Sequence, residues 1–471
     1  MSLIILSIPM FFLLIGIEVL ISKVRHLPYY RFNDAITNLS CGVGSQVSGL
    51  LIKALTVGGY YFIYNYSPWK GRIPTEWWMW LLLWVAVDFF YYWFHRLAHE
   101  VSVLWGSHVV HHQSEEYNLT VALRQAWFQG AFSWVFYLPL AFVGFEPKMF
   151  LAVASINTLY QFWIHTRLIG KMHPAIEYVF NTPSHHRVHH GVNPKYIDRN
   201  HGGTFIIYDR LFGTFQEEEE EVVYGITSQP RSWNPLWLNF EYWIDLFKDV
   251  ARVSSWTDKL KMLVMQPGWK PAELGGTQPY KEITTQQFQK YNTTISAGLS
   301  YYVFFQYILM IVGTSAFLFT ETKPPFDQNL LLKFSAIGLV VLTVVSMGGM
   351  FEHKRWTVPL EYLRFALLII FIFALHTPVA IVIATAVVAL VSVGWFSFYL
   401  GEFALTNVQP EQPEEIDHVP TPVVGVLPAN VVDVLLQIGW SGPALAVVNW
   451  STVIVIILVN TSSGVQVKLV K

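Results

Sequence analysis

Apolar stretches long enough to cross a lipid bilayer recur along this chain, and they restrict its fold more than any other feature. A membrane-spanning helix needs about 20 consecutive apolar residues, because no water in the bilayer core can satisfy an exposed backbone. The chain is 53% hydrophobic and only 13% charged, whereas a soluble domain carries about 25% charged residues. The sequence therefore predicts an all-α integral membrane protein built as a multi-span helical bundle.

The predicted spans fall into two sets. They lie near residues 1–22, 41–64, 76–94, 126–145 and 148–166, then near 297–319, 329–350, 359–376 and 378–400, with a last one near 443–460. A tight turn at residues 146–148 should join the fourth and fifth spans into a hairpin. We therefore expect a catalytic membrane domain with a cytosolic cap at 1–295 and a second transmembrane unit at 296–400. Residues 401–471 would form a linker and an apolar C-terminal segment, to which we assign no role.

Charge and cysteine content exclude several protein classes. The net charge is −2, and no basic stripe suggests a surface for nucleic acid. A single cysteine, Cys41, excludes intramolecular disulfides and thiolate metal clusters. The chemistry must therefore come from other side chains.

Short clusters of histidine supply that chemistry. His95 and His99 are four residues apart, so a helix continuing the third span places both on one face. Two later clusters have the spacing H-x-x-H-H, and one more histidine ends the fifth span; these residues are His108, His111, His112, His186, His189, His190 and His165. Together they exceed the roughly four to six ligands of one ion, so they predict two metal ions with open positions. Imidazole binds iron, zinc and copper, so the ligand type leaves the metal undecided.

Several polar residues near these clusters are candidates to hydrogen-bond the second nitrogen of a metal-bound imidazole. They are Asp88, Glu100, Glu115, Glu116, Asp198 and Asn200. Asp88 stands inside an apolar span, where a carboxylate is unfavourable without a partner. Glu100 either binds a polar cofactor or pairs with Arg96. His185 is expected to support the third cluster rather than to lead it, and His201 is expected to be a hydrogen-bonding loop residue.

Basic residues near the histidines set the expected orientation of the chain. Arg96 and Arg124 flank the loop after the third span, and Arg187 lies within the third cluster. Because short loops rich in Lys and Arg stay in the cytosol, we expect the metal site at the cytosolic face. The membrane would be the endoplasmic reticulum in a eukaryote and the inner membrane in a bacterium. A histidine-rich metal transporter is an alternative, but it would place its ligands near mid-membrane in several spans.

The histidine clusters resemble the signature of the fatty acid hydroxylase and sterol desaturase superfamily, which is H-x(3–4)-H, H-x(2–3)-H-H and a later H-x(2–3)-H-H. In this chain the signature stands at 95–99, 108–112 and 186–190. The surrounding stretches 91–100, 117–125, 181–186 and 211–215 are similar to members that oxidise ether lipids. The resemblance covers roughly residues 30–230.

This resemblance implies a membrane monooxygenase with two iron ions bound by the histidine clusters. The expected reaction hydroxylates the ether-linked carbon of alkylglycerol lipids in the bilayer with molecular oxygen, and tetrahydrobiopterin is the reductant. The products are a fatty aldehyde and a glycerol derivative. No catalytic residue beyond the metal ligands is implied, and Glu100 is the predicted contact to the cofactor. The nearest alternative is a sterol or fatty acyl hydroxylase or desaturase of the same superfamily. The family pattern tends to place tyrosine where this chain has His201.

Overall fold

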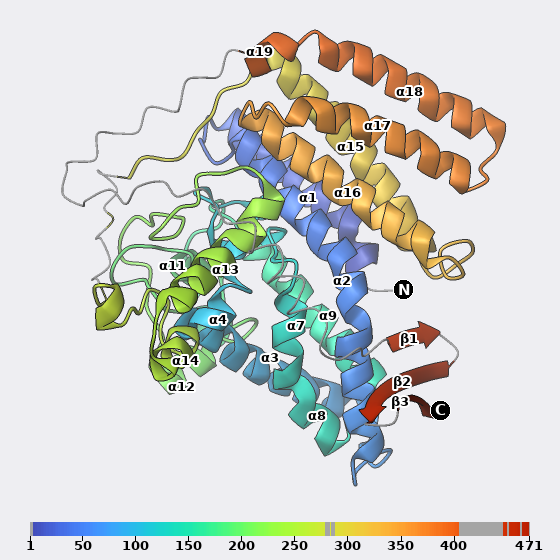
Figure 1. Ribbon diagram of the computed structural model, residues 1–471. Helices are drawn as coiled ribbons and strands as arrows, with labels where there is room; N and C mark the ends of the chain where they lie inside the picture. Colours follow the sequence, from blue (N-terminus) through green and yellow to red (C-terminus); the bar gives the residue numbers. More distant parts are fainter. Residues whose placement is uncertain are drawn as a thin grey trace.

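The computed structural model describes residues 3–277, 283, 288–404, 446–449, 452–461 and 464–470. The described residues up to 404 form helices and loops, as Figure 1 shows, so the all-α prediction is confirmed for the membrane part. Among the described residues, named strands occur only near the C-terminus, where β1 (Ala446–Asn449), β2 (Thr452–Thr461) and β3 (Gly464–Val470) form an antiparallel sheet.

The prediction of a span near 443–460 is wrong, because β1 and β2 occupy that segment. Its run of valine and isoleucine favours strands, since branched side chains fit a pleated surface. The predicted Pro- and Glu-rich linker at 407–421 lies outside the described residues.

Six of the described helices are long and apolar enough to cross a membrane. They are α1 (Leu3–Val24), α2 (Phe32–Tyr66), α15 (Ala297–Thr320), α16 (Leu330–Phe351), α17 (Thr357–Ala374) and α18 (Val379–Ser397). They correspond to the predicted first and second spans and to the four spans of the second unit, although α2 begins well before the predicted residue 41. Apolar side chains such as Leu20, Val312 and Leu390 are exposed on their outer faces. These features are those of an integral membrane protein.

The other three predicted spans do not qualify as membrane-crossing helices. α3 (Trp77–Glu100) is rich in Trp and Tyr, which have low hydropathy, and α9 (Pro147–Trp163) has only 17 residues. The predicted fourth span breaks into α7 (Gln129–Ser133), η1 (Trp134–Tyr137) and α8 (Leu138–Val143). Pro139 lies in the first turn of α8, and a proline lacks the N–H that would continue the preceding helix. Gly144, at φ 100°, forms the predicted turn before α9.

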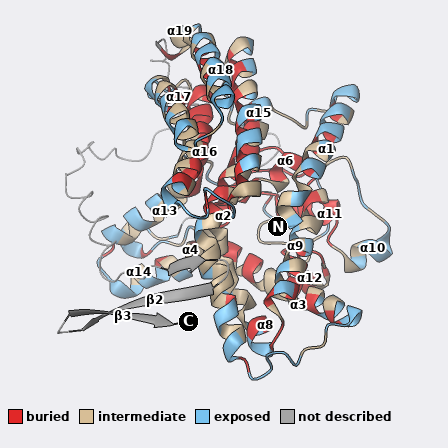
Figure 2. Cartoon of the chain, turned by 90° about the vertical axis from the view of Figure 1, so that its right-hand side faces the viewer, coloured by how far each residue is buried: buried red, intermediate tan, exposed pale blue. Residues whose placement is uncertain are grey.

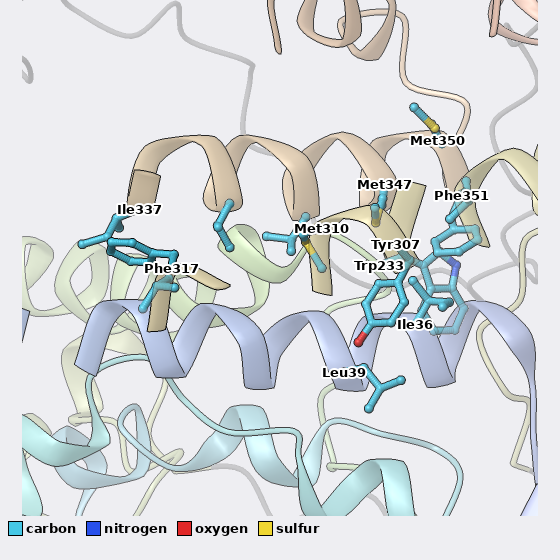
Figure 3. Packing of buried hydrophobic residues seen from close by; sticks show 14 of the residues in the cluster. Ile36, Leu39, Trp233, Tyr307, Met310, Phe317, Ile337, Met347, Met350 and Phe351 are labelled. Atoms are coloured by element: carbon cyan, nitrogen blue, oxygen red, sulfur yellow. The ribbon is translucent and has the colours of Figure 1, made fainter. Parts of the chain in front are cut away.

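The long helix α2 joins the two membrane units (Figure 1). Its Leu39 belongs to one apolar cluster with Tyr307 of α15 and Met347 of α16, part of which Figure 3 shows. Gly42 lets α2 approach the loop after the second histidine cluster, since a Cβ there would lie 2.3 Å from the Leu123 carbonyl oxygen.

Short elements form a cap around the histidine clusters. They are α4 (Ser102–Trp105), α5 (Val109–His112), α6 (Leu119–Ala122), α10 (Pro174–Val179), α11 (Pro183–His189), α12 (Ile207–Phe212), α13 (Pro235–Arg252), α14 (Trp256–Val264) and η2 (Ala272–Leu274), while α19 (Leu400–Ala404) follows α18. Every residue of α11 is buried, and Figure 2 shows this helix among buried residues. The segment 202–207, whose Thr, Phe and Ile residues favour a strand, makes only one bridge, between Phe180 and Phe205. This cap encloses the polar chemistry of the chain.

Candidate metal centre

The predicted histidines converge in two buried groups. The first group contains His95, His99, His108, His112 and His189, and the second contains His111, His165, His186 and His190. In each group, one ring nitrogen from every histidine lies within 4.8 Å of those from the other members. The structure thus brings together all the predicted ligands, and it divides them as two metal ions would require.

Each H-x-x-H-H cluster contributes to both groups. The first and last histidines of the second cluster, His108 and His112, join the first group, while His111 joins the second group. The third cluster does the reverse, because only its middle member, His189, joins the first group. Consecutive residues on a helix point about 100° apart, whereas residues i and i+4 share a face. The motif is therefore suited to bridging two adjacent ions.

The inner ring nitrogens face one another at short distances. The Nε2 atom of His108 lies 3.0 Å from Nε2 of His95 and 3.1 Å from Nε2 of His112. In the second group, Nε2 of His165 lies 3.2 Å from Nε2 of His111 and 3.0 Å from Nε2 of His186. In a neutral imidazole whose Nδ1 donates a proton, Nε2 carries a lone pair. Converging lone pairs repel unless a cation lies between them, so this donor set fits metal ions.

Carbonyl oxygens hold most of the outer ring nitrogens. The Nδ1 partners are His201 O for His95 (2.7 Å), Arg124 O for His111 (2.9 Å), Gln161 O for His165 (2.7 Å), Arg199 O for His189 (2.9 Å) and the side-chain Oε1 of Gln129 for His108 (3.0 Å). A carbonyl can only accept a hydrogen bond, so each of these histidines carries its proton on Nδ1 and directs Nε2 inward.

Among the predicted carboxylate partners, only Asp198 lies beside a histidine nitrogen, with Oδ1 3.6 Å from Nδ1 of His99. The prediction for Asp88 is wrong, because its carboxylate accepts the backbone N–H groups of Thr204 and Phe205, each at 2.8 Å. Asp88 precedes His95 by two helical turns, about 10 Å along the axis, which exceeds hydrogen-bond reach.

Glu115 and Glu116 are also not partners of the histidines. Both carboxylates contact the guanidinium of Arg31, at 3.3 Å and 2.6 Å. Glu100 accepts a hydrogen bond from Arg96 at 2.9 Å, which was one of the two alternatives for this residue.

The loop after the third cluster presents its carbonyls to the histidines through two left-handed residues, Asp198 (φ 56°) and Asn200 (φ 57°). Asn200 is fully buried, and its amide donates to the carbonyls of His185 (3.0 Å) and Gln216 (2.8 Å). Its Oδ1 accepts the N–H of Gln216 at 2.9 Å. The prediction that Asn200 hydrogen-bonds an imidazole is therefore wrong: its side chain bonds backbone groups of the loop, and asparagine tolerates this backbone conformation better than most residues.

His201 is closer to the centre than its predicted loop role suggested. Its side chain is fully buried, and its ring centroid lies 5.1 Å from that of His99 and 5.7 Å from that of His95. Gln129, the partner of His108, was not foreseen either. It lies 21 residues from His108, and no local spacing links the two.

Burial keeps the imidazoles neutral. Desolvation lowers the pKa of His165 to about 3, although the bond to the Gln161 carbonyl opposes the shift. Desolvation likewise lowers the pKa of His108 to about 4, with the bond to Gln129 opposing it. Neutral imidazole is the form that binds a metal ion, so the site is preorganised for ligation.

A cavity of about 270 Å³, which we call the membrane-side cavity, reaches His108, His111 and His165. Its other walls come mainly from α1, α2, α9 and α15, with Tyr91 of α3 and residues between 122 and 129, and among the described residues they carry no Asp, Glu, Lys or Arg side chain. It therefore leads from the histidines into the transmembrane region.

A second cavity of about 330 Å³, the polar cavity, reaches His99, His112, His189 and His190. Its walls include the aromatic rings Trp105 and Trp269 and the charged residues Asp198, Glu241, Asp245, Asp249 and Lys270. Among the described residues, none lines both cavities. The paired groups are thus approached by two separate cavities of different character.

Comparison with known proteins identifies the family. The fatty acid hydroxylase family model matches residues 80–214, which include the nine histidines. An alkylglycerol monooxygenase of Xenopus tropicalis is 38% identical over 361 residues, covering 75% of this chain and 78% of that protein. The chain belongs to the alkylglycerol monooxygenase family. The superfamily predicted from the motifs is therefore confirmed.

Other comparisons agree with this family. The alkylglycerol monooxygenase of Homo sapiens is 35% identical over 364 residues, covering 76% of this chain and 79% of that protein. An ornithine lipid hydroxylase of Rhizobium tropici is 27% identical over 190 residues, covering 39% of this chain and 57% of that protein. No solved structure matches the chain. Because the two alkylglycerol monooxygenases each match about three quarters of the chain, the similarity extends well beyond the histidine region.

Proposed function

We propose that this protein oxidises the ether-linked carbon of alkylglycerol lipids with molecular oxygen. One oxygen atom enters the C–H bond next to the ether oxygen, and the other leaves as water with electrons and protons from a reductant. The resulting hemiacetal collapses to a fatty aldehyde and a glycerol derivative. The observation that carries the proposal is the pair of separate cavities that reach the histidines, one lined by four carboxylates and a lysine and the other, within the described part of the chain, by no Asp, Glu, Lys or Arg side chain.

The histidine groups would each hold one metal ion, and iron is our proposal for both. Bound there, the metal would supply the binding and reduction of oxygen, which imidazole-ligated iron supports. The protein would contribute a buried site with ring nitrogens held by carbonyls, so that little reorganisation accompanies the reaction. Exclusion of water would protect reactive species from side reactions.

The membrane-side cavity would hold the lipid. Its described walls, which carry no Asp, Glu, Lys or Arg side chain, suit an alkyl chain that enters from the bilayer. The cavity ends at His108, His111 and His165, so a chain lying in it would present its ether-linked end to the histidines.

The polar cavity would hold the reductant, proposed as tetrahydrobiopterin. Carboxylates such as Glu241 and Asp245 can accept the N–H groups of a pterin ring, and Trp105 offers an aromatic face. Burial, assisted by the negative charge of Glu100, raises the pKa of Asp198 in this cavity to about 6. Glu100 does not itself line the cavity, but its charge acts on Asp198, which does, and we retain it as a proposed cofactor contact.

We also propose that the centre faces the cytosol, on the basis of the basic residues in its loops. A reductant made in the cytosol would then have access to the polar cavity. The membrane would be the endoplasmic reticulum in a eukaryote or the inner membrane in a bacterium.

The test compares matched histidine variants of the full-length protein in membranes. His112→Gln removes a ligand of the first group, and His26→Gln changes an exposed histidine outside both groups. We expect fatty aldehyde from alkylglycerol with the wild type and His26→Gln when tetrahydrobiopterin is supplied, and none with His112→Gln. Metal analysis should show a lower metal content only in His112→Gln. Turnover by His112→Gln, or oxidation of sterols or acyl chains in place of alkylglycerol, would refute the proposal.

A further inference from the structure

One wall of the membrane-side cavity comes from the second membrane unit. Helix α15 contributes Tyr307, Ile311, Thr314, Ser315 and Leu318, which recur at helical spacing and so share one face. This helix lies outside the residues matched by the fatty acid hydroxylase family model. The cavity is therefore incomplete without a helix that the histidine-bearing region does not supply.

The N-terminal end of α15 adjoins the histidine loop. The segment just before the helix is anchored there, since the N–H of Tyr291 donates to Glu115 at 2.7 Å and Lys290 pairs with Glu116 at 2.7 Å. These two glutamates follow His112 closely in the sequence. Among the cavity residues of α15, Tyr307 is the nearest along the helix to this end. Leu318 lies about 16 Å further along the helix axis.

The hydroxyl of Tyr307 is buried without a hydrogen-bond partner. Only 1% of the residue is exposed, and Figure 3 shows its hydroxyl pointing toward α2. The Thr314 hydroxyl also lacks a partner, but a helical threonine can rotate to bond the carbonyl one turn earlier. The phenol of a tyrosine cannot reach its own backbone in this way. A buried hydroxyl without a hydrogen-bond partner is unfavourable, so a ligand oxygen in the cavity would stabilise Tyr307.

We propose that α15 is the specificity wall of the lipid site. Tyr307 donates a hydrogen bond to an oxygen at the glyceryl end of the substrate, close to the histidines. The turn containing Thr314, Ser315 and Leu318 contacts the alkyl chain and limits its length. This inference rests on the proposed function, because it assigns the polar and apolar ends of that substrate to opposite ends of the cavity.

The length limit is tested with two tryptophan substitutions one residue apart. Ser315→Trp fills the cavity, whereas Ala316→Trp adds similar bulk at an exposed position outside the cavity lining. Methylene groups that no longer fit must fold back or stay in the bilayer, so kcat/KM should fall as the alkyl chain lengthens. For a series of alkylglycerols, Ser315→Trp should lower the ratio of long-chain to short-chain kcat/KM at least about tenfold, which is the discrimination that an apolar pocket can make over one methylene group. Retained turnover of the short-chain substrate would show that Ser315→Trp is folded. Ser315→Leu introduces a smaller side chain at the same position and tests the same limit with less risk of misfolding. An equal chain-length preference in Ser315→Trp and Ala316→Trp would overturn the proposal.

The polar contact is tested with Tyr307→Phe and the control Tyr301→Phe, whose side chain is exposed on the same helix. We expect Tyr307→Phe to raise KM for alkylglycerol about fivefold to tenfold with little change in kcat, the effect of one lost hydrogen bond. An unchanged KM would refute the role of Tyr307. The failure of the proposed function is distinguishable, because the wild type itself would then form no aldehyde. In that case an alkyl lipid carrying a photoreactive diazirine still tests the wall, and absence of label on α15 would overturn it.

Discussion

Asn200 offers the sharpest test of how the metal centre is held. Its left-handed backbone conformation directs the loop whose carbonyls bind His95 and His189. Its side chain makes three hydrogen bonds to buried backbone groups of His185 and Gln216. The residue touches no predicted ligand with its side chain, so any loss of metal in an Asn200 variant must act through the loop.

The expected loss of stability follows from these contacts. Three hydrogen bonds at about 0.5–1.5 kcal/mol each give roughly 2–4 kcal/mol for Asn200→Ala. Alanine in the left-handed conformation adds about 1 kcal/mol, a cost that glycine avoids. We therefore expect Asn200→Ala to be less stable than Asn200→Gly by about 1 kcal/mol. Asn200→Asp keeps an acceptor for the N–H of Gln216 but turns its second oxygen toward the carbonyls of His185 and Gln216, so we expect it to be at least as destabilised as Asn200→Ala.

The assay is thermal unfolding of the detergent-solubilised protein, together with the metal bound after equilibration with a chelator. Loss of support for ligating histidines typically weakens metal binding by about 10–100-fold. We expect that range for Asn200→Ala and a smaller effect for Asn200→Gly, which keeps the left-handed backbone without strain. If Asn200→Ala unfolded at the wild-type temperature and kept its metal, the carbonyls would not depend on this residue and the reasoning would fail.

Two further predictions concern buried charges. Glu361 and Arg364 of α17 form an ion pair in the second membrane unit. Glu361→Ala leaves the guanidinium buried without its partner, so it should destabilise the protein by about 3–5 kcal/mol, whereas changing both residues to leucine should cost much less. Equal losses of thermal stability in the two variants would contradict this. Burial raises the pKa of Glu115 from 4.5 to about 7 despite its contact with Arg31. The folded protein therefore holds the Glu115 proton more tightly than the unfolded chain does. The free energy of unfolding includes this contribution fully below pH about 4.5 and loses it as the pH rises through about 7. Glu115→Gln should therefore gain stability relative to the wild type, by up to about 3 kcal/mol, between those pH values, and a difference that does not vary with pH would exclude this role.

Eight of the nine ligand candidates could be predicted because histidine spacing is a local property, and His165 was predicted from its place at the end of the predicted fifth span. His95 and His99 had to share a helix face, and the two H-x-x-H-H clusters repeated that geometry. The division between the groups could not be predicted, since His111 and His112 are neighbours in sequence but belong to different groups. That division depends on how α3, α5 and α11 are packed together.

The partners of the outer nitrogens illustrate the same limit. Carboxylates such as Asp88 were predicted because their side chains are visible in the sequence, yet the structure uses backbone carbonyls for His95, His111, His165 and His189. Every residue has a carbonyl, so residue types carry no signal for this role. Only the path of the backbone decides which carbonyl reaches an imidazole.

The amino-acid sequence by itself determined the membrane class, the helical secondary structure of the spans in α1, α2 and α15–α18, and the histidines of the centre. These properties follow from hydropathy and from the period of the helix, both of which act over a few turns. Only the tertiary structure decided the pairing of the histidines, the two cavities that reach them, and the place of α15 in the wall of the membrane-side cavity. Those properties require segments far apart in the chain to pack side by side, and local physical chemistry does not specify that packing.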